Sequence, residues 1–213
     1  MKPEELVKNL HWLGHDGFRL DGPTVIYFDP WKLHGKHVPA DLVLISHEHH
    51  DHCSPDDIKK VSGPKTVVVA SSGAAAKLPG SRAIKPGDRL TAAGVSIEAV
   101  PAYNLTKFRS PGVPFHPQGA GHVGYIVTVG GVRLYFAGDT DQIPEMTAID
   151  CDVALLPVSG IYVMTVEEAA AAARTINPQI VVPMHFGAGI GTEGDGLRFK
   201  ELYGGQVALL QVE

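Results

Sequence analysis

The 213-residue sequence predicts a layered α/β fold, and three observations support this prediction. Short segments rich in β-branched and aromatic residues alternate with segments of helical character along the chain. Residues 42–45 form an uninterrupted apolar run, which is typical of a strand covered on both faces of its sheet. Hydrophobic residues make up 44% of the chain, enough for a substantial core. We therefore expect one α/β domain over residues 1–213.

The expected elements follow from local signals. Ser54, Pro55 and two following acidic residues predict a helix over residues 56–61, and a capping box of Thr165 and Glu168 predicts a helix over 166–176. Shorter helices are expected over 71–78 and 197–203. The expected strands cover residues 10–13, 18–20, 24–28, 41–46, 66–70, 89–91, 95–100, 122–129, 132–136, 153–157, 180–183 and 206–211. Residues 103–121 show neither helical nor strand periodicity, which indicates a long functional loop.

Charge and composition exclude several classes of function. The net charge of −5 and the absence of a basic run argue against nucleic acid or an anionic membrane as partner, so we expect a small-molecule substrate. No apolar stretch approaches the roughly 20 residues of a membrane helix. With only Cys53 and Cys151, and a beginning without the apolar core of a signal peptide, the expected location is the cytoplasm. The oligomeric state is left open.

The strongest functional signal is a group of metal-ligand residues directly after the apolar run. His47, His49, Asp51 and His52 lie within six residues, and Asp139 and His185 each follow a later strand. Strand ends suit an active site because the sheet is rigid while the loops vary. A surface metal-scavenging tract is the alternative interpretation. It is disfavoured because the group follows a buried strand and includes Asp51 at fixed spacing.

The spacing also favours two metal ions. His47 and His49 are alternate residues that can point the same way, while Asp51 and His52 can turn toward a neighbouring position, and Asp139 could bridge the two. Imidazole and carboxylate ligands suit divalent zinc, manganese, iron or nickel, with zinc as the first expectation.

These motifs resemble those of a known family. The sequence His-Glu-His-His-Asp-His of residues 47–52 matches the His-X-His-X-Asp-His signature of the metallo-β-lactamase superfamily. Within it, the chain is similar to the small hydrolases related to the ascorbate-6-phosphate lactonase group. The supporting matches are Gly14 with His15, Asp29 with Pro30, and segments 137–140 and 183–187.

The resemblance implies an αββα four-layer sandwich with a dinuclear site at one edge of the paired sheets. His47 and His49 would bind the first metal. Asp51, His52 and His185 would bind the second, and Asp139 would bridge the two.

One departure from the family pattern concerns the first site. Asn104 stands where the family supplies a third histidine, and asparagine is a far weaker ligand than imidazole. His116, from the following loop, is the best replacement, with His122 and His15 as further options. Asn104 and His116 are also the candidate substrate-binding residues.

The expected chemistry is hydrolysis by a metal-bound hydroxide, since metal charge lowers the pKa of water from 15.7 toward about 7. Asp51 would orient or deprotonate this water, and His15 would assist catalysis. A lactone, ester or phosphodiester is the expected substrate, and Lys107 and Arg109 are candidate contacts for a phosphate. The alternative is a non-catalytic metal-binding relative, a sensor or scaffold, with an incomplete first site.

Overall fold

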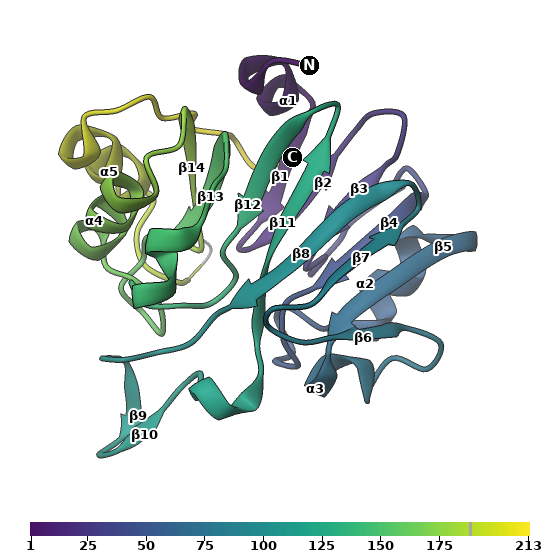
Figure 1. The fold of residues 1–213 in the computed structure, drawn as a ribbon, viewed down its shortest axis with the longest axis horizontal. Helices are drawn as coiled ribbons and strands as arrows, with labels where there is room; N and C mark the ends of the chain where they lie inside the picture. Colours follow the sequence, from purple (N-terminus) through teal and green to yellow (C-terminus); the bar gives the residue numbers. More distant parts are fainter. Residues whose placement is uncertain (188) are drawn as a thin grey trace.

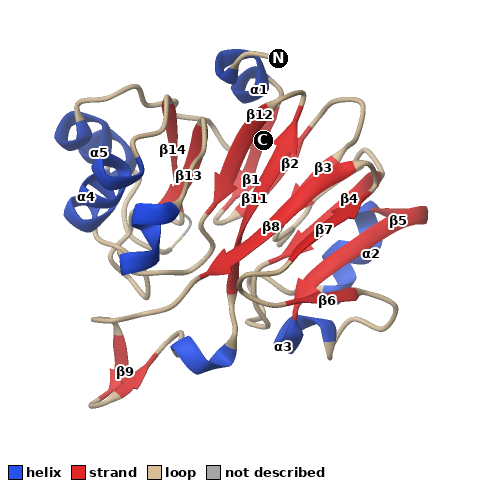
Figure 2. Cartoon of the chain, in the orientation of Figure 1, coloured by secondary structure: helices blue, strands red, loops and turns tan. Residues whose placement is uncertain are grey.

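Two six-stranded sheets pack face to face in a computed structural model that describes residues 1–187 and 189–213. Helices cover the outer faces, α4 and α5 on one side and α2 and α3 on the other (Figures 1 and 2). The predicted αββα sandwich is therefore confirmed.

The first sheet has the order β1-β2-β3-β4-β5-β6. Strands β1 to β3 pair antiparallel and β3 to β6 pair parallel. Helices α2 (Pro55–Val61) and α3 (Ser72–Ala75) contact β5. The strands are β1 (Leu10–Gly14), β2 (Gly17–Leu20), β3 (Ile26–Phe28), β4 (Ala40–Ile45), β5 (Ser62–Ser71) and β6 (Arg82–Ile84).

The second sheet has the order β14-β13-β12-β11-β8-β7 and repeats this plan. Strands β7, β8, β11 and β12 form antiparallel pairs, and β12, β13 and β14 form parallel pairs. Helix α4 (Val166–Ile176) packs against β13 and α5 (Asp195–Tyr203) against β14. The strands are β7 (Arg89–Ala92), β8 (Val95–Pro101), β11 (Val123–Val129), β12 (Val132–Phe136), β13 (Val153–Pro157) and β14 (Ile180–Met184).

Strand β4 shows why the sandwich needs helices outside its sheets. Leu42 and Leu44 point into the core between the sheets, whereas Val43 and Ile45 pack in a second cluster with residues of α2 and α3. Successive side chains of a strand point to opposite faces, so a continuous apolar run must be covered on both.

The residues that predicted the starts of helices α2 and α4 cap these helices in the structure. The Ser54 hydroxyl accepts a hydrogen bond from the backbone N–H of Asp57 at the start of α2. At α4, Thr165 and Glu168 form the predicted capping box, and Asn177 ends the helix in the left-handed conformation with φ of 55°.

Several elements differ from the expectations. Helix α1 (Pro3–Lys8) and strand β6 were not predicted, because each is too short to show a period. The expected strand over 206–211 was wrong: this segment makes one isolated bridge, between Val207 and Val181. The expected helix over 71–78 is shorter, since α3 ends at Ala75.

The long loop of residues 103–121 contains a small projecting hairpin of β9 (Phe108–Ser110) and β10 (Val113–Pro114), visible at the lower left of Figure 1. Two 3-10 helices, η1 (Gln118–Ala120) and η2 (Pro144–Ala148), complete the elements. No helix of the described chain has the length and apolar character needed to cross a membrane.

We predict that Tyr125→Phe lowers the free energy of unfolding by about 1 kcal/mol. The Tyr125 hydroxyl, on β11, donates a hydrogen bond of 2.8 Å to the carbonyl of Ile45 and so ties the two sheets together. The measurement is urea unfolding. The matched control is Tyr135→Phe, since the Tyr135 hydroxyl is also buried but has no hydrogen-bond partner among the described residues. Equal effects of the two variants would contradict the assigned role.

Candidate metal centre

Residues 47–52, which carry the His-X-His-X-Asp-His signature, follow the end of β4 and turn back over it. Asp29, which follows β3 with φ of 38°, fixes the turn: it accepts hydrogen bonds from the Ser46 backbone and hydroxyl and from His52 Nδ1. Asp29 is fully buried, so the Asp29-Pro30 pair does more than end a strand. It places Ser46 and His52 for the site.

A first cluster contains three imidazoles. His47 and His49 lie with Nε2 and Nδ1 3.0 Å apart, and the His116 ring centroid is 5.0 Å from each of their ring centroids. One nitrogen from each of these rings lies within 4.8 Å of the others. Three imidazoles at this separation can share one metal ion.

His116 reaches this cluster because Asn104 holds it. The Oδ1 of Asn104 accepts hydrogen bonds of 2.9 Å from both His116 Nδ1 and the His116 backbone N–H. This leaves His116 Nε2 facing Asp139, 3.2 Å from Oδ2. The amide nitrogen of Asn104 donates to Asp141 and to the Tyr162 carbonyl, so the Asn104 side chain is fully engaged within the protein.

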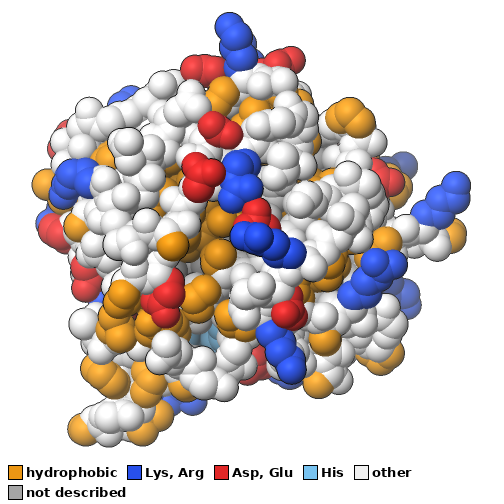
Figure 3. Space-filling view, in the orientation of Figure 1, with side chains coloured by type: hydrophobic (Ala, Val, Ile, Leu, Met, Phe, Trp, Pro, Cys, Tyr) orange, Lys and Arg blue, Asp and Glu red, His pale blue; other side chains and the backbone are white. Residues whose placement is uncertain are grey.

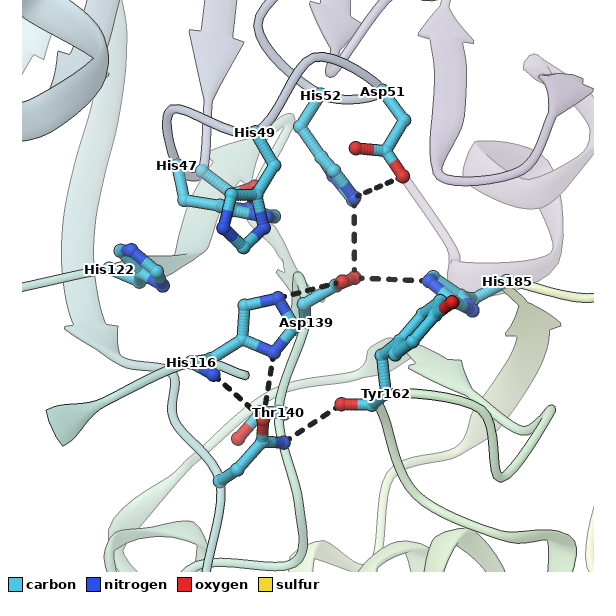
Figure 4. A network of polar contacts seen from close by, with 12 residues as sticks. His47, His49, Asp51, His52, His116, His122, Asp139, Thr140, Tyr162 and His185 are labelled. Atoms are coloured by element: carbon cyan, nitrogen blue, oxygen red, sulfur yellow. Dashed lines mark hydrogen bonds and ion pairs between the residues drawn. The ribbon is translucent and has the colours of Figure 1, made fainter. Parts of the chain in front are cut away.

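A second cluster lies on the other side of Asp139. The Oδ1 of Asp139 is 3.5 Å from Nε2 of both His52 and His185. Asp51 Oδ2 is 4.0 Å from His52 Nε2 and 3.3 Å from His15 Nε2. Asp139 therefore presents one oxygen to each cluster, as Figure 4 shows.

Most of these rings are oriented by a hydrogen bond at their second nitrogen. The Nδ1 atoms of His47 and His185 lie 2.9 and 3.0 Å from the hydroxyls of Ser46 and Ser159. His52 Nδ1 bonds to Asp29 at 2.8 Å. Such bonds fix the tautomer and direct the free nitrogen at a ligand.

The residues fit divalent metal ions. Four buried atoms of the residues that the sequence indicated have no hydrogen-bond partner in the part of the chain that the structure describes: Nε2 of His15, His52 and His185, and Oδ1 of Asp139. Buried polar atoms without partners cost about 1–3 kcal/mol each. Imidazole and carboxylate ligands are those that divalent transition metals bind.

Most of the pKa shifts favour the protonation states that bind metal; the exception is His52, whose pKa is raised because Asp139 and Asp29 outweigh the opposing effect of burial. Burial lowers the pKa of His15 and His49 to about 4, and burial also lowers the pKa of His47. Burial opposes ionisation of Asp51 and Asp139, but the neighbouring histidines outweigh it and hold both pKa values below their usual range. Neutral imidazole and ionised carboxylate are the metal-binding forms.

A pocket of about 270 Å³ opens onto both clusters. Figure 3 shows histidine at the floor of a recess edged by hydrophobic side chains. A larger cavity of about 740 Å³ lies beside it, but of the metal-ligand candidates it contacts only His15. We therefore take the smaller pocket as the substrate entrance. Its lining residues are His49, His50, Asp51, Arg109, Phe115, His116, Asp139 and Tyr162.

The structure brings together all the candidates that the sequence indicated. The other five expected ligands and His15 lie around Asp139, and His116 lies in the first cluster. The substrate-binding roles of Asn104 and His116 stay predictions. His122 is buried beside this cluster, with Nε2 3.3 Å from Glu48.

Sequence reasoning missed several residues that support the site. Asp16 is fully buried near the second cluster, although the tight turn that contains it looked like an ordinary polar turn. Ser46 and Ser159 contact the Nδ1 atoms of His47 and His185, and Asp141 accepts a hydrogen bond from the Asn104 amide. No local pattern distinguishes such residues, because their partners are distant in sequence.

Comparison with known proteins supports this description. The profile of the beta-lactamase superfamily domain matches residues 9–185. A UPF0173 metal-dependent hydrolase of Methanoculleus marisnigri is 37% identical over 185 residues, covering 83% of this chain and 80% of that protein. The corresponding protein of Thermococcus kodakarensis is 34% identical over 218 residues, covering 94% and 95%.

Solved structures share the same fold. A metal-dependent hydrolase of Parabacteroides distasonis superposes with a TM-score of 0.84 at 37% identity, over 95% of this chain and 93% of that one. A metallo hydrolase of Ignicoccus hospitalis gives a TM-score of 0.75 at 26% identity, over 95% and 94%. A Zn-dependent hydrolase of the metallo-beta-lactamase superfamily from Thermotoga maritima, at 21% identity and a TM-score of 0.66 over 96% and 98%, shows the fold.

We predict that Asn104→Leu weakens metal binding at the first cluster by about 10–100-fold, because His116 loses the acceptor that fixes its ring. The measurement is titration of metal-free protein with zinc in competition with a chromophoric chelator. The matched control is Thr106→Val, which removes another bond from the same loop to Asp141 without touching His116. Unchanged zinc affinity in Asn104→Leu would show that His116 needs no such support.

Acidification should destabilise the metal-free protein. The pKa values of His15 and His49 are lowered from 6.5 to about 4, so the unfolded chain binds more protons between these values. The stability from these two groups is present above about pH 6.5 and is lost as the pH falls toward 4. The pKa of His52 is raised, which opposes the trend, but lowered pKa values of His47 and His122 add to it.

The measurement is urea unfolding of chelator-treated protein at several pH values across this window. His15→Asn should give a shallower fall, whereas substitution of the exposed His34 by Gln should leave the profile unchanged. A free energy of unfolding that rises on acidification would refute the prediction.

Proposed function

We propose, from the premise that the chain belongs to the beta-lactamase superfamily and is a metal-dependent hydrolase, that it cleaves a small-molecule lactone, ester or phosphodiester. The observation that carries the proposal is the shared carboxylate of Asp139 between two histidine clusters at the floor of one pocket. This arrangement suits two divalent ions, with zinc first and manganese, iron or nickel as alternatives.

The ions would supply the nucleophile, by lowering the pKa of water toward about 7, and would polarise the bond to be cleaved. His47, His49 and His116 would hold the first ion. Asp51, His52 and His185 would hold the second, and Asp139 would contact both. This is the ligand set expected from the sequence, with His116 added.

Two side chains are candidates for proton transfer. Asp51 lines the pocket, and its low pKa keeps it ionised and able to orient or accept a proton from the attacking water. His15 Nε2 lies 3.3 Å from Asp51 Oδ2 and is 5% exposed, so it can bond to this carboxylate away from bulk solvent.

The pocket itself supports a small substrate with an anionic or strongly polar group. Arg109 is the one Lys or Arg among its lining residues. Lys107, the other cation of the loop, is bound to Glu168 at 2.6 Å and lies 3.4 Å from Asp141. Lys107 therefore stabilises the loop through these ion pairs, and Arg109 is the stronger candidate for contact with substrate. Phe115 and Tyr162, whose ring centroids are 4.6 Å apart, form an apolar wall.

A non-catalytic sensor or scaffold remains the competing proposal. Its support was the absence of a third histidine at Asn104. His116 occupies the corresponding place in the first cluster, so the reason to favour this alternative is weaker.

The test is a substrate panel of lactones, esters, thioesters and phosphodiesters, assayed with metal-free protein and after addition of zinc or manganese. We expect activity to disappear with chelation and to return with metal. Asp51→Asn should lower kcat by roughly 10²–10⁴-fold, because the proton acceptor is lost.

Metal content is measured for each sample, and a Gln substitution of His34, an exposed residue of the loop before β4, is the control with normal activity. Protein that binds two equivalents of metal yet hydrolyses none of the four classes would favour the sensor or scaffold. Normal turnover in Asp51→Asn at normal metal content would remove Asp51 from the proposed mechanism.

A further inference from the structure

Asp16 is a buried carboxylate that neither the sequence motifs nor the proposed mechanism uses. It lies beside His15 in the turn between β1 and β2 and is 0% exposed. The turn is pinned inward, because the His15 carbonyl accepts hydrogen bonds from Trp12 Nε1 at 2.9 Å and from the His185 backbone N–H at 3.2 Å. Asp16 is thereby fixed next to the strand end that carries His185.

No Lys or Arg in the described chain pairs with this carboxylate, and burial, together with the nearby Asp139, raises the pKa of Asp16 above its usual range. Neither oxygen of Asp16 has a hydrogen-bond partner among the described residues. Within 4.0 Å, its one basic neighbour in the described ranges is His52, whose Nδ1 is 3.9 Å away. That nitrogen already bonds to Asp29 at 2.8 Å. A buried carboxylate needs a paired charge, a metal or a proton, since its desolvation is otherwise costly.

The unpaired oxygens lie beside the other orphaned atoms of the site. One ligand atom from each of Asp16, His52, Asp139 and His185 lies within 4.8 Å of all the others. A metal ion with bonds of about 2.2 Å holds its ligand atoms at most about 4.4 Å apart, so only a small closure brings Asp16 into the coordination sphere.

We propose that Asp16 is an additional ligand of the second metal and makes that site selective for manganese over zinc. The inference rests on the metal centre of the proposed function but not on hydrolysis. With Asp16, the second site has the three carboxylates of Asp16, Asp51 and Asp139 beside its imidazoles, whereas the first site has three imidazoles and a single carboxylate. Carboxylate-rich sites suit manganese, and imidazole-rich sites suit zinc.

The competing explanation is a protonated Asp16 that donates a hydrogen bond to Asp139. Substitution by Asn separates the two, because the Asn amide donates a hydrogen bond as a carboxylic acid does but is a much weaker metal ligand. Asp16→Asn keeps the shape of the side chain and removes its charge.

The first experiment loads metal-free wild-type and Asp16→Asn protein with equal amounts of zinc and manganese. Bound metal is measured by mass spectrometry, and bound manganese by electron paramagnetic resonance. We expect one equivalent of each metal in the wild type. In the variant we expect at least about a tenfold loss of manganese affinity with zinc retained in the first site. Equal manganese binding by the two proteins overturns the proposal.

The second experiment compares thermal unfolding of the metal-free and metal-loaded proteins. Asp16→Asn should reduce the increase in Tm on adding manganese, because a ligand of the metal in the folded protein is lost. A purely structural Asp16 would give a lower metal-free Tm and an unchanged increase, which also overturns the proposal.

The matched control is Asp57→Asn. Asp57 is also buried, but it accepts hydrogen bonds from the Lys32 and Leu33 backbone and from Lys60. Its substitution should lower the metal-free Tm and leave metal content unchanged. Asp16→Ser serves the same comparison should Asp16→Asn fail to fold. Because metal is measured without substrate, a lack of hydrolysis would count against the proposed function alone.

Discussion

The buried carboxylate of Asp139 is the group on which the rest of the site depends. Its two oxygens face separate clusters, 3.2 Å from His116 and 3.5 Å from both His52 and His185. At 4% exposure it cannot rely on water for its charge, and no Lys or Arg pairs with it within the described residues. The surrounding rings bond to the protein through one nitrogen and present the other to the centre. This arrangement fits divalent cations held between Asp139 and the rings.

The fold supports this centre by bringing the ends of strands from both sheets to one edge, and it also fixes the irregular loop that supplies His116. Asp141, two residues beyond Asp139, accepts hydrogen bonds from the Leu105 and Thr106 backbone at 2.7 and 2.6 Å and from the Asn104 amide at 3.2 Å. The same strand end therefore provides the carboxylate between the two clusters and, through Asp141, the anchor of the loop. These hydrogen bonds fix the first residues of the loop, although its sequence shows no helical or strand periodicity.

Local signals predicted much of the fold and much of the site. The uninterrupted apolar run of β4, the cap of α2 and the capping box of α4 all depend on neighbouring residues, and each appeared where expected. The strand expected over residues 206–211 failed because its apolar residues pack onto the core without a partner strand, apart from one bridge between Val207 and Val181. Strand pairing is a long-range property that a short apolar segment does not specify.

The sequence by itself determined which chemical groups stand at the strand ends, since the His-X-His-X-Asp-His spacing and the positions of Asp139 and His185 are local facts. Only the tertiary structure decided how these groups combine. It placed His116 in the first cluster through Asn104, and it buried Asp16 beside the second. The physical reason is that burial and ligand geometry come from packing between segments far apart in the chain, whereas a sequence pattern reports only the residues that are near one another.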